Sequence, residues 1–372
     1  MTLPNGAGGQ PSEQPFGELE LVHAFTAGPM PTGVTVSRRG RIFVNFPKWG
    51  DDVTATVVEL RDGEAVPYPD ERWNGEAGDE AGRLVSVQSV VVDPLDRLWI
   101  LDTGSPLFRP PRPGGPKLVR VDLADDTVAQ VVHLQPDVAL GTTYLNDVRF
   151  DLRKGESGCA YITDSSDKGP NGIIVVDLAT GQARRRLHDD PTTKAETPPG
   201  FVPLVEGRPF MERPPDGPPK PVTMGADGIA ISADGRRLYY CPLLSRSLYS
   251  VSADALTDPS LSEEEIAATV AYEGDRGGAA DGLESDDAGR VYMTNWEHNA
   301  VLRRHPDGTM ETLVHDPRLL WPDTLSVTDG YVYVTANQLH RQARFQNGRD
   351  LRRHPYALYR IPIDAGPVRL LP

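Results

Sequence analysis

The sequence predicts an all-β protein, a six-bladed β-propeller with four-stranded blades around a central channel. Three observations predict it: a hairpin pattern occurs in six copies, the spacing inside the copies is nearly constant, and further strand pairs follow the copies. The 36 glycines and 35 prolines among 372 residues fit many short strands joined by tight turns. An open all-β sandwich of this length is the alternative fold.

Each copy starts with small or polar residues, continues into a β-rich run, turns, and ends in a second β-rich run. The copies span residues 31–46, 87–104, 145–164, 226–242, 280–296 and 322–337. In four copies the step from the start of the first run to the end of the second is 13 residues, as from Gly282 to Asn295. The segment LELVHAF (19–25) precedes the first copy and is expected to complete the last blade, which closes the ring.

The domain organisation follows from the repeat. We expect one propeller over residues 19–372, preceded by a disordered tail over residues 1–18. The tail has neither a basic start nor an apolar segment, so we predict no signal peptide and expect a cytoplasmic protein. Two long segments, 62–86 and 188–223, do not fit the repeat and are expected to cover part of the channel.

Composition excludes several classes of function. The net charge of −15 leaves no basic surplus for nucleic acid, and no run of about 18 apolar residues could span a membrane. The two cysteines, Cys159 and Cys241, are expected to be free thiols, with a single bridge as the alternative. The expected partner is a small molecule, and the sequence gives no indication of the oligomeric state.

Polar residues occur at the strand ends that meet at one mouth of the channel. The residues that open the six copies form an expected inner ring: Thr32, Gln88, Asn146, Asp227, Asp281 and Asp323. The ends of the second runs form an outer ring: Asn45, Asp102, Asp164, Cys241, Asn295 and Asn337. Such oxygen-rich rings suit a divalent cation, calcium or magnesium, or carboxylates whose mutual repulsion raises a pKa for acid–base work. Alternatively, these residues bond only the local backbone of turns.

Two histidines and several tryptophans extend this candidate site. His298 and His340 each follow an outer-ring asparagine by three residues, where an imidazole could transfer protons. Trp296, with Trp49, Trp73 and Trp321, could line an aromatic pocket or pack between blades. The candidate catalytic residues are therefore Asp281, Asp227, His298 and His340. The candidate substrate contacts are Asn146, Gln88, Asp323, Asn295, Asn337 and Trp296.

Several segments, taken in order, resemble the major royal jelly protein/yellow family. They are PYPDERWN, VSVQSVVVDPLDRLWILDTG, PKLVRVDL, TYLNDVRFD with YITDSS, and MGADGIAISADGRRLYYCPLLSRSLY, within a match from about residue 30 to 340. The chain is short and poor in cysteine, like a bacterial-type member. The resemblance implies a six-bladed propeller but no single activity, since the family includes tautomerase-like enzymes, storage proteins and amine-binding salivary proteins.

The related gluconolactonase/luciferin-regenerating superfamily implies metal-dependent hydrolysis of lactones and esters. Matched by blade, Asp227 and Asp281 would be metal ligands, with Asp281 also the base, and Asn146 would complete the set or hold the substrate. The glutamate that this superfamily supplies from its first blade is absent, since Pro31 and Thr32 stand there.

Two functions are therefore expected as alternatives. One is an enzyme at the channel mouth that hydrolyses, isomerises or tautomerises a small cyclic or aromatic metabolite. The other is a non-catalytic protein that binds a small aromatic or amine ligand at the same mouth. A protein-interaction platform is a third possibility that no residue singles out.

Overall fold

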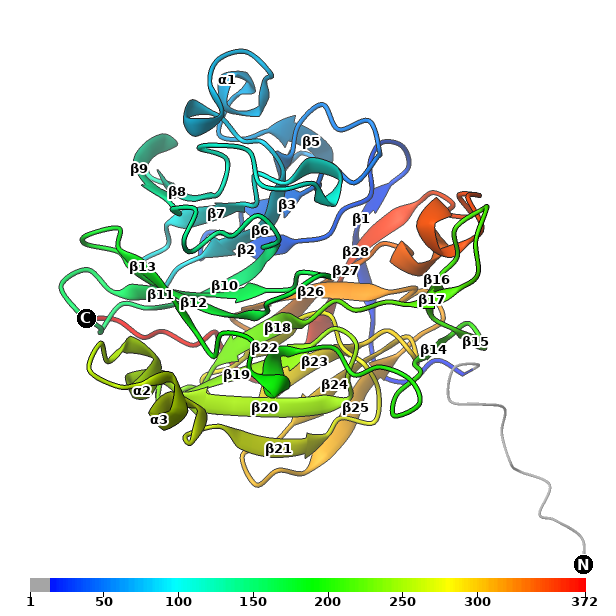
Figure 1. Ribbon diagram of the computed structural model, residues 1–372. Coiled ribbons are helices and arrows are strands. Elements are labelled where there is room, and N and C mark those ends of the chain that lie inside the picture. The colour runs from blue at the N-terminus through cyan, green and yellow to red at the C-terminus, as the bar shows by residue number, and fades with distance from the viewer. Residues whose placement is uncertain (1–13) are drawn as a thin grey trace, which may run out of the picture.

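The computed structural model describes residues 14–372, which form six antiparallel four-stranded sheets arranged in a ring (Figure 1). The predicted six-bladed β-propeller is confirmed. Five blades are continuous in sequence and run outwards from the channel in the orders β2–β5, β6–β9, β10–β13, β18–β21 and β22–β25. The sixth blade has the order β26-β27-β28-β1 and joins the two ends of the chain.

The strand bounds follow the repeat. Blades one to three comprise β2 (Val34–Val36), β3 (Ile42–Asn45), β4 (Val57–Arg61), β5 (Glu64–Pro67); β6 (Val87–Val92), β7 (Leu98–Asp102), β8 (Lys117–Asp122), β9 (Thr127–His133); and β10 (Leu145–Asp151), β11 (Cys159–Asp164), β12 (Gly172–Asp177), β13 (Ala183–Arg186). Blades four to six comprise β18 (Ala226–Ile231), β19 (Arg237–Pro242), β20 (Ser247–Ser252), β21 (Ala271–Asp275); β22 (Leu283–Ser285), β23 (Val291–Asn295), β24 (Ala300–Arg304), β25 (Met310–His315); and β26 (Pro322–Thr328), β27 (Tyr331–Ala336), β28 (Tyr356–Pro362), β1 (Glu20–Phe25).

The ring closes through its innermost strands and through the chain ends. Strands β2, β6, β10, β18, β22 and β26 contact one another in sequence, and β26 contacts β2 in turn. Strand β1 pairs with β28, as expected for residues 19–25, so the last blade contains strands from both ends of the chain. This closure leaves no open edge between the first and last blades.

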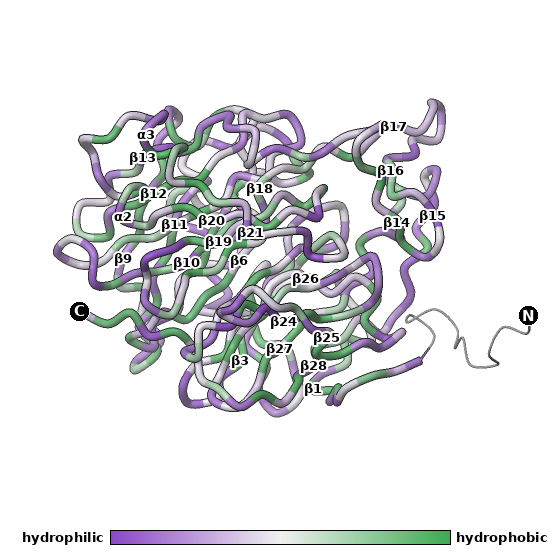
Figure 2. Tube along the Cα trace, turned by 90° about the horizontal axis from the view of Figure 1, so that it is seen from below, coloured by the Kyte–Doolittle hydropathy of each residue, from purple (hydrophilic) through white to green (hydrophobic). Residues whose placement is uncertain are grey.

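The hydrophobic core lies between neighbouring blades. One cluster joins Trp99 and Leu118 of the second blade to Val148 and Ile162 of the third. Because each central strand is buried on both faces, its residues are nearly all apolar, as in Leu98–Asp102 before its final aspartate. Figure 2 shows hydrophobic residues concentrated in the blades and hydrophilic residues in the outer loops.

The two long segments have different positions. Residues 62–86 supply β5, α1 (Glu71–Asn74) and the 3₁₀-helix η2 (Glu80–Gly82), at the outer side of the first two blades (Figure 1). Residues 188–223 supply η4 (Pro191–Thr193) and two small hairpins, β14 (Leu204–Val205) with β15 (Arg208–Pro209) and β16 (Met211–Glu212) with β17 (Lys220–Pro221). The remaining short helices are η3 (Pro106–Phe108), α2 (Ala253–Thr257), α3 (Glu263–Ala267), η5 (Leu339–Arg341) and η6 (Ala343–Phe345).

Three other expectations concern the chain as a whole. Most of the predicted tail falls on residues 1–13, outside the described residues, and Phe16 forms an antiparallel bridge with His315. Cys159 and Cys241 are both buried free thiols. None of the helices formed by residues 14–372 has the length and apolar character that crossing a bilayer requires.

Candidate functional site

Five of the six expected inner-ring residues meet at one mouth of the channel. Gln88, Asn146, Asp227, Asp281 and Asp323 line the same small cavity, and each comes from a different blade. All five are buried. The sixth residue, Thr32, does not line this cavity, and its hydroxyl accepts a hydrogen bond from the Asn45 side chain at 2.9 Å.

β-Bulges direct these side chains into the channel. The pairing between the first and second strands shifts register near Gln88, Asn146, Asp227 and Asp323, at the start of four innermost strands. A bulge bends its strand and changes the direction in which a side chain points. The same irregularity in four blades therefore brings side chains from separate sheets to one point on the axis.

The glycines that follow two of the acids allow neighbouring blades to approach closely. A Cβ atom on Gly228 would lie 2.4 Å from the carbonyl oxygen of Asp281, and one on Gly282 would lie 2.3 Å from that of Asp323. These glycines are therefore needed for backbone packing around the axis rather than for a turn, which corrects the alternative interpretation of the Asp-Gly pairs. The Asp-Gly repeat thus marks where the innermost strands touch.

Four buried acids line this site: Asp147 pairs with Arg149, and the other three have pKa values that burial raises. Burial raises the pKa of Asp281 to about 6, although hydrogen bonds from Trp321 (2.7 Å) and with Asp227 favour its ionised form. Burial and the charge of Asp281 raise the pKa of Asp227 well above its ordinary value, and the same two causes act on Asp323. The three acids therefore hold their protons to a higher pH than exposed carboxyl groups do, and Asp281 has a pKa of about 6.

Amide and phenol groups complete the polar surface. Asn146 donates its side-chain N–H to Asp227, and Asn337 donates to Asp323 at 2.6 Å. Tyr144, next to the start of β10, donates its hydroxyl to Gln88 at 3.0 Å. Burial raises the pKa of Tyr144, so its hydroxyl stays protonated and serves as a hydrogen-bond donor.

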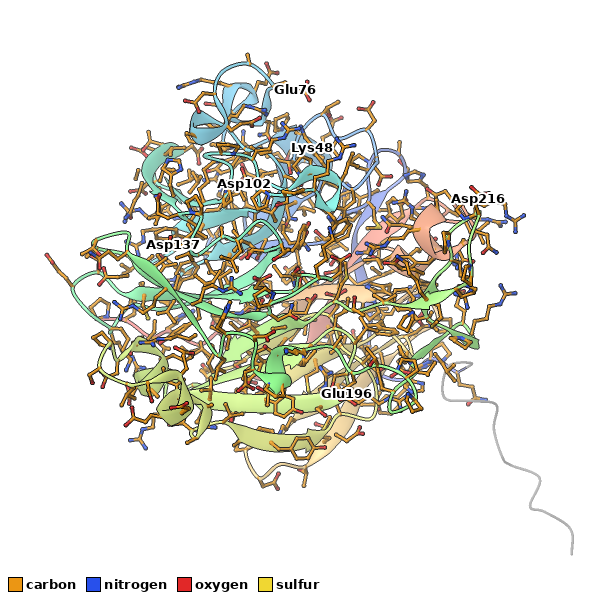
Figure 3. The ribbon with its side chains drawn as sticks, viewed as in Figure 1. Lys48, Glu76, Asp102, Asp137, Glu196 and Asp216 are labelled. Atoms are coloured by element: carbon orange, nitrogen blue, oxygen red, sulfur yellow. The ribbon has the colours of Figure 1, made fainter. Side chains whose placement is uncertain are left out.

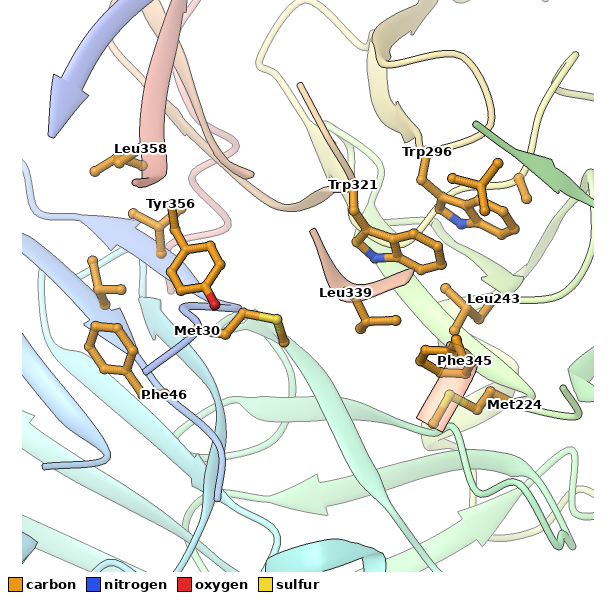
Figure 4. Packing of buried hydrophobic residues seen from close by; sticks show 14 of the residues in the cluster. Met30, Phe46, Met224, Leu243, Trp296, Trp321, Leu339, Phe345, Tyr356 and Leu358 are labelled. Carbon is orange, nitrogen blue, oxygen red and sulfur yellow. The ribbon is translucent and has the colours of Figure 1, made fainter. Parts of the chain in front are cut away.

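Aromatic side chains from loops cover the acids. Trp49 stacks on Phe108 at 5.1 Å between ring centroids, and its indole N–H donates to the Tyr144 hydroxyl at 2.6 Å. Phe345 faces them from the loop after β27, and the guanidinium of Arg344 lies over the rings of both Phe108 and Phe345. Figure 4 shows Phe345 beside Met224, Leu243 and Leu339, which line the same cavity.

The cover leaves little free volume over the acids. The cavity between the aromatic rings and the carboxyl groups measures about 30 Å³, far below the roughly 300–1,000 Å³ of ordinary small-molecule pockets. Arg344 links the cover to the rest of the protein, because it forms ion pairs with Asp167 of the third blade and Glu212 of β16. A ligand of ordinary size therefore requires Arg344 and its neighbours to move.

Most outer-ring residues have structural roles. Asp102 accepts backbone N–H groups of Val85, Ser86 and Gly104 and pairs with the fully buried Lys117 at 2.9 Å (Figure 3). Asp164, Asn45 and Cys241 are likewise buried; the Asn45 amide donates to the Val87 and Gln88 carbonyls of the second blade, and Cys241 has a pKa raised by burial. Asn295 is buried against Gly278 and does not line the cavity, whereas Asn337 contacts the site through Asp323.

The structure does not bring the two histidines and Trp296 to the acids. His298 is exposed and lines none of the cavities described above. His340 is buried, donates through Nε2 to the Glu206 carboxylate at 2.8 Å, and lines a neighbouring groove. Trp296 is fully buried and stacks on Trp321 at 4.4 Å, so it packs between blades instead of facing a ligand (Figure 4). These three residues therefore lie outside the cavity that the acids line.

The expected metal ligands do not fit a cation as they are arranged. Asn146 turns an N–H toward Asp227, and Asp227 bonds to Asp281 instead of leaving both carboxylates open. Within residues 14–372, no three His, Cys, Asp or Glu side chains are placed to hold a metal ion. The first-blade position is Thr32, whose hydroxyl is already used by Asn45. We therefore derive no chemical step through a metal.

The opposite mouth of the channel has a larger cavity but compensated charges. This cavity measures about 290 Å³ and is lined by the far ends of the innermost strands. Two of its charged groups pair with each other, since Arg149 contacts Glu284 at 3.2 Å, and Arg149 also reaches Asp147 on the side of the acids at 2.9 Å. The carboxyl groups without an ion-pair partner among the described residues, Asp227, Asp281 and Asp323, lie at the covered mouth.

Solved structures of six-bladed propellers resemble this chain. Regucalcin from Agrobacterium tumefaciens, a calcium-binding protein, is 15% identical with a TM-score of 0.55, over 93% of this chain and 97% of its own. A luciferin-regenerating enzyme is 11% identical with a TM-score of 0.56, over 96% and 100% of the two chains. A gluconolactonase from Xanthomonas campestris is 12% identical with a TM-score of 0.53, over 95% and 98%. At these identities the likeness concerns the fold.

Relatives in sequence belong to one family. Major royal jelly protein 3 of Apis mellifera is 28% identical over 234 residues, which are 62% of this chain and 38% of that protein. Protein yellow of Drosophila melanogaster is 27% identical over 246 residues, 60% of this chain and 41% of that protein. The chain thus spans about half the length, or less, of these relatives. Residues 85–362 match the sequence model of the family described as major royal jelly protein, and the chain belongs to this family.

Proposed function

We propose that this protein is an enzyme that transfers protons on a small cyclic or aromatic carbonyl compound. The observation that carries the proposal is the buried carboxyl pair Asp227–Asp281, in which burial raises the pKa of Asp281 to about 6 and the charge of Asp281 helps to raise the pKa of Asp227 well above its ordinary value. Pairs of titratable groups with separated pKa values are the usual arrangement for combined acid and base catalysis. Isomerisation or tautomerisation is the reaction class that such a pair serves directly.

The proton balance assigns a role to each acid. The Asp281 carboxylate takes a proton from the carbon next to the carbonyl, while protonated Asp227 gives its proton to the carbonyl oxygen, which yields an enol. Collapse of the enol returns a proton to a different atom and restores both carboxyl groups. In lactone or ester hydrolysis the same base would take a proton from water, and the same acid would protonate the leaving oxygen.

Other residues would position the substrate. Asn146, Gln88 and the Tyr144 hydroxyl present polar groups beside the acids, and Asp323 is a second protonated donor. The rings of Trp49 and Phe108 would stack on a flat substrate from above. Exclusion of water by these rings would strengthen each hydrogen bond to the developing negative charge.

A second candidate is a binding protein for a small aromatic amine. The aromatic cover over a group of acids favours it, because a cation can interact with both the rings and the carboxyl groups. Binding of a cation would lower the pKa values of Asp227 and Asp323, so protons would be released to the buffer on binding. Proton release without turnover would favour this candidate.

Turnover of a panel of compounds tests the proposal. The panel combines lactones, cyclic ketones and quinones derived from catechols, followed by absorbance with the full chain. We expect turnover of at least one class to fall about 10² to 10⁴-fold in Asp281→Asn, and to be unchanged in Asp287→Asn, an exposed acid far from the mouth. Equal turnover in Asp281→Asn and the unmodified protein would refute it. Turnover that a chelator removes and calcium or magnesium restores would replace it by a metal mechanism.

A further inference from the structure

A second groove lies beside the covered mouth, between two loops that are distant in sequence. It measures about 660 Å³ and is lined by residues 205–213 of the β14–β16 segment and residues 340–353 that follow β27. Figure 1 shows these hairpins next to the short helices of the last blade, and backbone contacts such as Arg213 N–H to the Arg344 carbonyl (2.9 Å) join them. The groove shares Phe345 with the cavity over the acids but none of the acids themselves.

The charge of this groove is opposite to that of the protein. Five arginines line it against two carboxylates, although the whole chain carries a net charge of −15. The arginines are Arg208, Arg213, Arg341, Arg352 and Arg353.

Both carboxylates are already used by other groups. Glu206 accepts hydrogen bonds from Arg341 at 3.0 Å and bonds to Nε2 of His340 at 2.8 Å. Asp350 pairs with Arg352, which also binds Asp51 at 2.6 Å. The groove's own acids therefore leave no negative charge for its other arginines.

Three guanidinium groups in the groove have no carboxylate partner among residues 14–372. Arg213 donates only to the backbone carbonyls of Pro209 (2.8 Å) and Met211 (3.3 Å). Arg208 and Arg353 are exposed at the rim, and neither forms an ion pair with the described residues. Like charges that converge on one groove repel each other unless an anion lies between them.

A buried polar atom gives a second, independent observation. His340 is 2% exposed and lines the groove, and its Nδ1 has no hydrogen-bond partner among the described residues. Its Nε2 is held by Glu206 and its ring stacks on Trp321 at 5.8 Å, so the imidazole cannot turn away to satisfy Nδ1 elsewhere. Burial lowers the pKa of His340, so Nε2 carries the proton that is donated to Glu206 and Nδ1 is a hydrogen-bond acceptor; a ligand in the groove would satisfy it with a hydroxyl group, such as the one citrate carries beside its carboxylates.

We propose that this groove binds a small polyanion, a molecule with two or more carboxylate or phosphate groups. Guanidinium groups bind both kinds of anion through pairs of parallel hydrogen bonds. Arg208 and Arg213 stand on one loop and Arg353 on the other, so an anion with two charged ends can engage both sides. This site is separate from the acid pair and does not rest on the proposed enzyme activity.

Calorimetry with defined anions tests the site. Citrate and pyrophosphate are titrated into the full chain at about 20 mM salt, with inorganic phosphate as the single-anion comparison. We expect citrate or pyrophosphate to bind about tenfold more tightly than phosphate, and binding to weaken as sodium chloride is added. Stronger binding of citrate would identify carboxylates as the ligand groups, and stronger binding of pyrophosphate would identify phosphates.

Paired variants separate this groove from the rest of the surface. The double variant Arg208→Ala/Arg353→Ala removes exposed side chains and is expected to weaken binding about tenfold or more. Arg236→Ala, whose side chain is 82% exposed in the fourth blade, is the matched control and should bind like the unmodified protein. Asp281→Asn should also bind normally, since the acids lie outside the groove. Failure of both polyanions to bind at millimolar concentration, or equal binding by the double variant, would overturn the proposal.

Discussion

Replacement of Asp281 by asparagine is expected to make the protein more stable at pH 8 while it sharply lowers turnover. Asparagine keeps the shape of the side chain: its oxygen can accept from the Trp321 indole N–H, and its amide can donate to Asp227. What the variant removes is a buried negative charge. If the variant lost activity because it misfolds, it would be less stable than the unmodified protein. The stability measurement therefore distinguishes loss of a catalytic group from loss of the fold.

The size of the effect follows from the pKa. Burial raises the pKa of Asp281 from 3.8 to about 6, and each pKa unit corresponds to about 1.4 kcal/mol, so ionisation of Asp281 costs the folded protein about 3 kcal/mol. Below pH 4 the carboxyl is protonated in both states and costs nothing. As the pH rises from about 4 to about 6, only the unfolded chain loses the proton, and stability falls. Above pH 6 the difference is constant.

Urea unfolding of both proteins at several pH values measures this difference. We expect the free energy of unfolding of Asp281→Asn to exceed that of the unmodified protein by up to about 3 kcal/mol at pH 8 and by little at pH 4. The gain at pH 8 is smaller if Asp227 and Asp323 ionise more readily once the charge of Asp281 is gone. Asp286→Asn is the control, because Asp286 is a buried acid that pairs with Arg290 at 2.6 Å, and its loss should destabilise the protein at pH 8. An Asp281→Asn variant that is less stable at pH 8 than at pH 4, relative to the unmodified protein, would refute the reasoning.

Three further predictions concern catalysis, packing and access. The catalytic efficiency should rise about tenfold per pH unit up to about pH 6, as Asp281 ionises, and should fall again where Asp227 loses its proton; a rate independent of pH between 5 and 7 would contradict the assignment of the base. Gly282→Ala should destabilise the protein by about 1–3 kcal/mol in urea unfolding, because its Cβ would meet a backbone oxygen at 2.3 Å, whereas Gly141→Ala, with nothing within 4 Å, should not. Arg344→Ala should let a ligand enter faster, seen as a higher association rate in stopped-flow tryptophan fluorescence; an unchanged rate would show that Arg344 does not hold the cover closed.

The fold was predictable because the repeat encodes it in every blade. Each copy carries the same spacing, and the ends of the innermost strands must then meet on the axis. The same logic predicted the acid group, since Asp227, Asp281 and Asp323 occupy equivalent positions. Periodicity in sequence becomes proximity in space wherever the repeats form a closed ring.

The repeat also led to wrong predictions, because some positions recur for a structural reason and not for a functional one. Two outer-ring residues, Asp102 and Asp164, are buried groups that bind the loop before the innermost strand of their own blade, so their recurrence has a structural reason. Trp296 lies at such a strand end and packs against Trp321, which the sequence could not distinguish from a ligand contact. A recurring position therefore indicates an equivalent location, and only its neighbours decide its role.

The cover over the acids could not be predicted from the repeat. Phe108 and Phe345 stand in loops that occur once in the chain, and Leu107 and Phe108 adopt positive φ angles of 58° and 54° that their residue types do not suggest. Tyr144 is the exception, because it lies two residues before the inner-ring Asn146 and its position beside the channel could have been inferred. Sequence reasoning thus located the acids but not the groups that enclose them.

The treatment of buried acids elsewhere in the chain argues for proton transfer over simple binding. Asp102 and Asp286 are fully buried, and each is paired with a lysine or an arginine. None of the ion pairs among residues 14–372 includes Asp227, Asp281 or Asp323, although Arg149 lies in the same channel and pairs with Asp147 instead. A counter-ion for a bound cation works best when it is ionised, whereas burial raises the pKa of all three acids and so disfavours their ionised forms. Stability is given up here to hold unpaired carboxyl groups with raised pKa values side by side, an arrangement that suits proton transfer better than the binding of a cation.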